Sequence, residues 1–130
     1  MVGSLSGAME EVYLAKETIR KWNQQNAERT GKVFMPIEWG STQEAIQNTD
    51  IVIGIIGNWI ENSKFVEDCV EADKQVMLFF DTYHDANNAI LSEVQAVEIF
   101  KKNMASLCKC FDYGGFDVFS DTVQMCLDTF

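Results

Sequence analysis

The stretch DIVIGIIGNWIENSKFVEDCVEADKQVMLFF, residues 50–80, contains the pattern that decides the fold. Its ends are two uncharged and mainly apolar runs, residues 51–57 and 75–80. Unbroken apolar runs of this length are typical of strands in a parallel sheet that is covered on both faces. Between them, Ser63 is a suitable N-cap for a helix that we expect to end near Asp73. The stretch therefore predicts a strand, a helix and a strand joined by a right-handed crossover.

The rest of the chain continues this alternation of helices and strands. Apolar residues recur at helical spacing after the N-cap candidate Ser6, and the sequence STQE is a capping box that opens a short helix. The predicted helices cover residues 7–24, 41–48, 90–104 and 119–130, and the further predicted strands cover residues 32–39 and 106–111. This order predicts a three-layer α/β fold of the flavodoxin-like type, with about four parallel strands and helices on both faces.

Length and charge limit the classes of function. A chain of 130 residues with 47% hydrophobic residues is expected to form a single domain over residues 1–130. Its formal net charge of −10 disfavours nucleic acids and anionic membranes as partners. No apolar run is long enough to span a membrane and no secretory signal precedes the first helix, so we expect a cytoplasmic protein.

The four cysteines are expected to be reduced thiols in that compartment. Cys108 and Cys110 alternate along one predicted strand and therefore point to the same face. A metal site would need two further ligands, for which His84 and Cys126 are the only loose candidates. Small apolar core residues explain these thiols better, so we expect four free and mostly buried cysteines, Cys69 included, and no bound metal.

Ligands of open parallel sheets bind beyond the carboxyl ends of the strands. Those ends are predicted at residues 37–41, 57–63, 80–85 and 111–115, and three of these four segments carry an aromatic residue next to an acid. The tryptophans can stack on a base or nicotinamide ring, or they can be caps of the core. The predicted ligand contacts are Glu38, Trp39, Ser41, Asn58, Trp59 and Ser63.

Glu67 lies about one turn inside the helix that follows the strand of residues 51–57. A carboxylate there can bind ribose hydroxyls or stabilise an oxocarbenium-like centre during glycosidic cleavage. The alternative is that Glu67, Asp68 and Glu71 form a solvated helix face that the helix dipole favours.

Several motifs, taken in order, resemble a known family. They begin with SLSGAMEEVYLAKETIRKWN and continue with MPIEW, DIVIGIIG, KFVEDCVEA, VMLFF, VQAVEIFKK and CFDYGGFDVF. Together they cover nearly the whole chain and resemble the TIR-like domain family of bacterial proteins of unknown function. That family shares its architecture with TIR domains and nucleoside 2-deoxyribosyltransferases.

The resemblance implies binding of a nucleotide such as NAD in a signalling or defence setting, with no tightly bound cofactor. Both related groups cut N-glycosidic bonds with a glutamate on the helix after the third strand, which corresponds to Glu67, with Glu71 as the rival. Whether this chain is an enzyme stays open. The alternative function is a non-catalytic interaction or oligomerisation module that kept only the scaffold.

One departure from the family predicts an oligomer. Only residues 1–3 precede SLS, so the first strand of the family is expected to be missing. Residues 32–39 would then pair directly with residues 51–57, or another chain would fill the gap. Apolar surface left uncovered by the missing strand predicts a homodimer.

Overall fold

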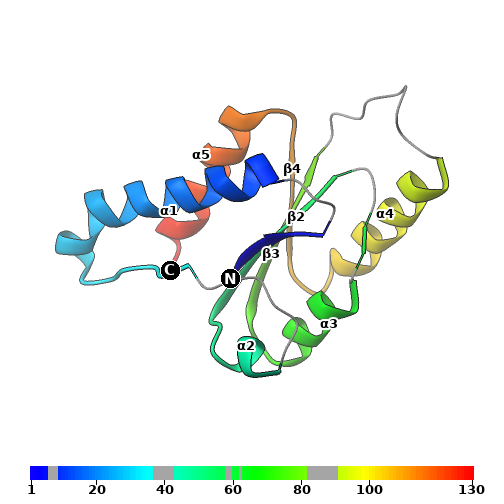
Figure 1. The fold of residues 1–130 in the computed structure, drawn as a ribbon, viewed down its shortest axis with the longest axis horizontal. Coiled ribbons are helices and arrows are strands. Elements are labelled where there is room, and N and C mark those ends of the chain that lie inside the picture. The colour runs from blue at the N-terminus through cyan, green and yellow to red at the C-terminus, as the bar shows by residue number, and fades with distance from the viewer. Residues whose placement is uncertain (6–8, 37–42, 58–59, 62, 82–90) are drawn as a thin grey trace.

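The computed structural model describes residues 1–5, 9–36, 43–57, 60, 61, 63–81 and 91–130. Four parallel strands form one sheet in the order β1-β2-β3-β4. Helices cover both faces of this sheet (Figure 1), so the predicted three-layer α/β fold is confirmed. The elements are β1 (Val2–Ser4), α1 (Met9–Thr30), α2 (Gln43–Gln47), β2 (Ile51–Ile56), α3 (Ser63–Glu71), β3 (Gln75–Asp81), α4 (Leu91–Met104), β4 (Lys109–Tyr113) and α5 (Phe116–Asp128).

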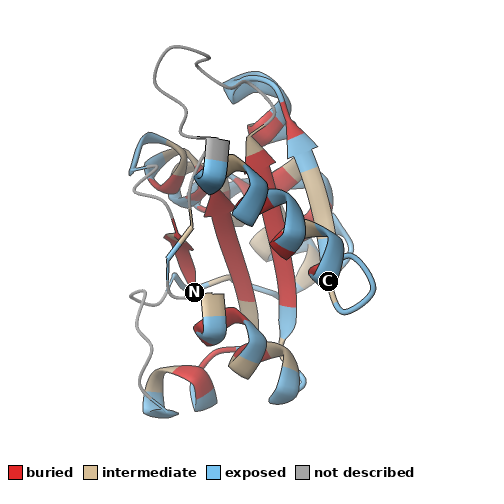
Figure 2. Ribbon diagram, turned by 90° about the vertical axis from the view of Figure 1, so that its right-hand side faces the viewer, coloured by how far each residue is buried: buried red, intermediate tan, exposed pale blue. Residues whose placement is uncertain are grey.

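Alternating side chains of each strand enter two separate cores. In β2, Val52 and Ile56 face the side of α3 and α4, whereas Ile53 and Ile55 face the side of α1 and α5. Both sides of β2 and β3 are buried, as the red central strands in Figure 2 show. This explains why residues 51–57 and 75–80 are apolar without interruption: each strand has helices on both faces.

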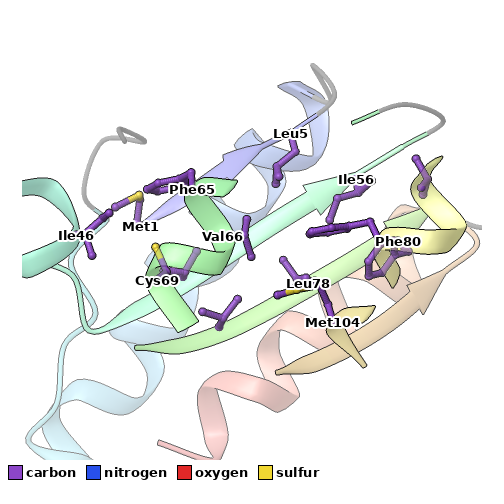
Figure 3. Packing of buried hydrophobic residues seen from close by; sticks show 14 residues of the cluster. Met1, Leu5, Ile46, Ile56, Phe65, Val66, Cys69, Leu78, Phe80 and Met104 are labelled. Atoms are coloured by element: carbon purple, nitrogen blue, oxygen red, sulfur yellow. The ribbon is translucent and has the colours of Figure 1, made fainter. Parts of the chain in front are cut away.

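Each core joins strands to the helices of one layer. On one face, Phe65, Val66 and Cys69 of α3 pack against β2 and β3, with Phe80 and Met104 completing the cluster (Figure 3). On the other face, aromatic and aliphatic side chains pack together, and Phe79 of β3 lies 5.2 Å from Phe119 of α5 between ring centroids. α1 and α5 pack against each other, and Trp22 Nε1 donates a 2.7 Å hydrogen bond to Asp128 Oδ1 between them.

The expectation that no strand precedes the first helix is wrong. Val2–Ser4 forms β1, which pairs with β2 in the register Val2 to Ile53 and Ser4 to Ile55. Val2 and Leu5 are buried, and Leu5 N donates to Ile55 O at 2.9 Å. A strand of three residues is too short to show a periodic pattern in the sequence. It forms here because the backbone of β2 offers hydrogen-bonding partners along its whole length.

The strand predicted over residues 32–39 is also wrong in its described part, since residues 32–36 form no strand. Asn23 of α1 takes the place of a neighbouring strand. Its Nδ2 donates to Phe34 O at 2.8 Å and its Oδ1 accepts from Phe34 N at 2.9 Å. The direct pairing predicted between this segment and β2 is therefore replaced by β1, and the homodimer loses the premise on which it was predicted.

The predicted helices exist, with shifted ends. α1 continues to Thr30, and Gly31 ends it with a left-handed φ of 70° while its N–H bonds Ala27 O at 2.8 Å. β4 begins at Lys109, later than expected, because the chain after α4 first turns through residues 105–107. Among the described helices, none is long and apolar enough to cross a membrane.

Candidate functional site at the carboxyl ends of β3 and β4

A recess of about 160 Å³ lies where β3 and β4 end. β3 ends at Asp81, β4 ends at Tyr113, and Glu11 comes from the first turn of α1. This is the edge of a parallel sheet at which ligands bind. The lining residues are Glu11, Asp81, Tyr113, Gly114, Gly115 and Phe116.

The fold fixes these side chains by different means. Tyr113 is the last residue of β4 and is only 3% exposed, with its ring 5.1 Å from the ring of Phe119. Gly115, which also lines the recess, is the extended N-cap of α5, and a Cβ at this position would meet no atom within 4 Å. Phe116 begins α5 and is 49% exposed at the rim. The recess therefore has a rigid phenol inside and an accessible aromatic ring outside.

Burial and like charge act together on the acidic groups. Burial raises the pKa of Glu11 above its ordinary value of 4.5, and the charges of Asp81 and Glu10 raise it further, against a lowering backbone hydrogen bond. Burial also raises the pKa of Tyr113, followed by the negative charges of Glu11 and Asp81. The phenol thus stays neutral at physiological pH, and Glu11 holds its proton more tightly than an exposed glutamate does.

This arrangement suits a ligand that carries hydroxyl groups and a ring. Carboxylate oxygens accept hydrogen bonds from hydroxyls, and a neutral phenol can donate one. The ring of Phe116 presents a surface for stacking. A volume of about 160 Å³ is below the roughly 300 Å³ at which sites for drug-sized ligands begin. The recess therefore accommodates one group of a larger ligand.

The predicted catalytic residue lies elsewhere on the surface. Glu67 and its rival Glu71 are exposed on α3, whose opposite side packs into the core, and neither lines the recess. Ser63 is the half-buried first residue of α3. The other predicted contacts, Glu38, Trp39, Ser41, Asn58 and Trp59, lie outside the described residues, as does His84.

Sequence reasoning did not name the residues of the recess as site residues. Two of the strand-end segments, residues 80–85 and 111–115, did pair an acid with an aromatic residue, and that signal points to Asp81 and Tyr113. The presence of Glu11 has a second explanation, because the helix dipole favours an acid in the first turn of a helix. Only the fold shows that α1 brings it to the ends of β3 and β4.

All four cysteines are free thiols. Cys69 and Cys126 are buried, and Cys108 and Cys110 are partly buried against the α3 and α4 core. Cys108 Sγ donates to Met104 O over 3.6 Å. Within the described ranges, no group of three or more histidine, cysteine, aspartate or glutamate side chains is placed to hold a metal ion.

Relatives of known function could show what binds in the recess. Comparison of the chain with known protein families, with curated proteins and with solved structures found no match. Membership of the TIR-like domain family therefore stays a prediction from the motifs, and the function proposed below depends on the geometry of the site.

Proposed function

We propose that this domain binds a nucleotide such as NAD at the carboxyl edge of its sheet. The observation that carries the proposal is the convergence of Glu11, Asp81 and Tyr113 on one recess at the ends of β3 and β4. Nucleotide sites in open parallel sheets use this edge, and an acid there contacts the ribose hydroxyls.

Each part of the recess has a role in this proposal. The carboxylates of Glu11 and Asp81 accept hydrogen bonds from the two ribose hydroxyls. The exposed ring of Phe116 stacks on the base or on the nicotinamide ring.

Cleavage of an N-glycosidic bond has less support from the structure than nucleotide binding has. Such cleavage uses a carboxylate held next to the anomeric carbon. Glu67 is exposed on α3, which favours the second candidate function, a non-catalytic interaction module. If cleavage occurs, Glu67→Gln should abolish it, because this change keeps size and hydrogen bonding but removes the charge. A cleaving activity that survives the change undiminished would show that Glu67 is not the catalytic group.

Binding can be tested by thermal shift and calorimetry with NAD, nucleoside monophosphates and nucleosides. A ligand at 100 times its dissociation constant should stabilise the fold by about 2.7 kcal/mol. Glu11→Gln and Asp81→Asn should each weaken binding, whereas Glu28→Gln, an exposed change on the same helix as Glu11, should leave it unchanged. If none of these ligands stabilises the protein, nucleotide binding is wrong and the interaction module is the better assignment.

A further inference from the structure

β4 forms one edge of the sheet, and no strand in the described part of the chain pairs with its outer side. It is also less buried than the central strands: Cys110 and Phe111 are partly buried, and Lys109 and Asp112 are exposed. We infer that this edge pairs with β4 of a second copy of the chain, in antiparallel orientation, so that one sheet continues across a dimer. Open edges of this kind are templates for strand addition.

The side chains beside the edge favour a partner. An apolar hollow of about 400 Å³ runs along β4 and α5, and Met125 stands 55% exposed in its wall. Phe111 also lines the hollow and stacks on Phe79 at 5.3 Å between ring centroids. A second Phe111 and Met125 placed opposite would fill the hollow and remove this apolar surface from water. The lining residues are Lys109, Cys110, Phe111, Met125, Cys126 and Thr129.

The charges at this edge are compatible with a second copy. The chain as a whole has a net charge of −10, yet among the described residues Lys109 is the only charged one that lines the hollow. The nearest acid on the strand, Asp112, forms an ion pair with Lys101 of α4. The lining of the hollow and β4 itself therefore contribute no unpaired carboxylate to this contact, in contrast to the acidic recess at the ends of the strands.

Symmetry selects the register. When two identical strands pair antiparallel about a two-fold axis, the residue numbers of every opposed pair add up to the same value. Centring the axis on Phe111 pairs all five residues of β4, whereas other centres pair fewer. Asp112 then lies opposite the second copy's Cys110, and Lys101 acts electrostatically on both Cys110 and Asp112 within one copy.

The opposite edge of the sheet is less suitable. β1 has only three residues, against five in β4, so its ladder is shorter. Residues 33–36 also lie beside it, since Val33, Phe34, Met35 and Pro36 line one hollow together with Met1 and Val2. A second copy would have to displace this segment. β4 carries no such cover among the described residues.

The first experiment measures the oligomeric state of the full chain by sedimentation at micromolar concentrations. The expected result is a reversible dimer of twice 14.7 kDa that salt strengthens, because both copies are acidic. Met125→Lys should weaken the dimer about tenfold or more. Tyr13→Lys is the matched control, since Tyr13 is 67% exposed on α1 and the charge change is the same.

The second experiment tests the register by cross-linking. Opposed residues of an antiparallel pair have their Cβ atoms about 4.5 to 5.5 Å apart, close to disulfide reach. In the variant D112C, glutathione disulfide should oxidise the introduced thiol and the second copy's Cys110 to one disulfide, with release of two reduced glutathiones. The double variant D112C with Cys110→Ser should give no covalent dimer.

The outcomes separate the possibilities. A dimer that Met125→Lys weakens and Tyr13→Lys does not, with a cross-link only when Cys110 is present, supports the inference. A monomer at all concentrations, equal effects of the two lysine variants, or cross-linking that does not depend on Cys110 would overturn it. None of these results depends on nucleotide binding.

Discussion

Asn23 and the backbone of Phe34 are joined by two hydrogen bonds of 2.8 and 2.9 Å, one donated by each residue. The side-chain amide of a helix thereby satisfies the main chain of a segment that has no strand beside it. The ring of Phe34 lies 4.8 Å from that of Trp22, so the same contact also closes the edge of the α1 and α5 core.

Asn23→Ala should therefore destabilise the fold by about 1 to 3 kcal/mol, because it leaves partly buried backbone groups without partners. Asn23→Asp should cost less, since a carboxylate still accepts from Phe34 N. Urea denaturation gives both values. Gln24→Ala is the control on the exposed side of the same helix, and an equal loss in that variant would contradict the role of the amide.

The raised pKa of Glu11 predicts a pH dependence of stability. The folded protein binds this proton more tightly than the unfolded chain, whose glutamate has an ordinary pKa of 4.5. The stabilisation is fully present below that value and is lost as the pH rises through the higher pKa of the folded state. Denaturation of wild type and Glu11→Gln should show a stability difference that changes over this window. Glu28→Gln should show no such change, and parallel curves for Glu11→Gln would refute the prediction.

The two partly buried thiols should differ in reactivity. Interaction with the Cys108 side chain lowers the pKa of Cys110 against the opposing effect of burial, and Lys101 lowers it further. The same interaction and burial raise the pKa of Cys108. Iodoacetamide should therefore alkylate Cys110 first in dilute protein, because the thiolate is the nucleophile.

Cys108→Ala and Lys101→Gln should each slow this alkylation, as mass spectrometry of the peptides would show. Lys102→Gln is the matched control, because it removes the same charge at a neighbouring exposed position. Faster labelling of Cys108 than of Cys110 would reverse the assignment.

The core on the α1 and α5 side depends on its aromatic rings. Phe119 is fully buried against Phe79 and Tyr113, so Phe119→Ala should cost about 3 to 5 kcal/mol. Val118→Ala, at a position that is 51% exposed, should change stability by about 0.5 kcal/mol or less. Similar losses in the two variants would mean that α5 does not pack as described.

The sequence predicts the buried elements well, because helices on both faces of the sheet impose unbroken apolar runs on β2 and β3. It fails at the edges. β1 is too short to show a pattern, and residues 32–36 have strand-like composition although a side-chain amide replaces the neighbouring strand. The recess needs tertiary information, since α2, β2 and α3 and most of α1 and β3 lie between Glu11 and Asp81 along the chain. The position of Glu11 also suits the start of a helix equally well.

The pairing of β1 also affects the order in which the sheet assembles. Met1 and Ile51 are 50 positions apart along the chain, whereas β2 and β3 pair Ile51 with Gln75, about half that separation. Closing the longer loop costs more chain entropy, so β2, α3 and β3 are expected to form first and β1 to dock last. The amide of Ile53, which donates to Met1 O at 2.8 Å, reports on this step. Although its side chain is only 2% exposed, this amide should exchange its hydrogen whenever β1 detaches, well before the sheet unfolds as a whole.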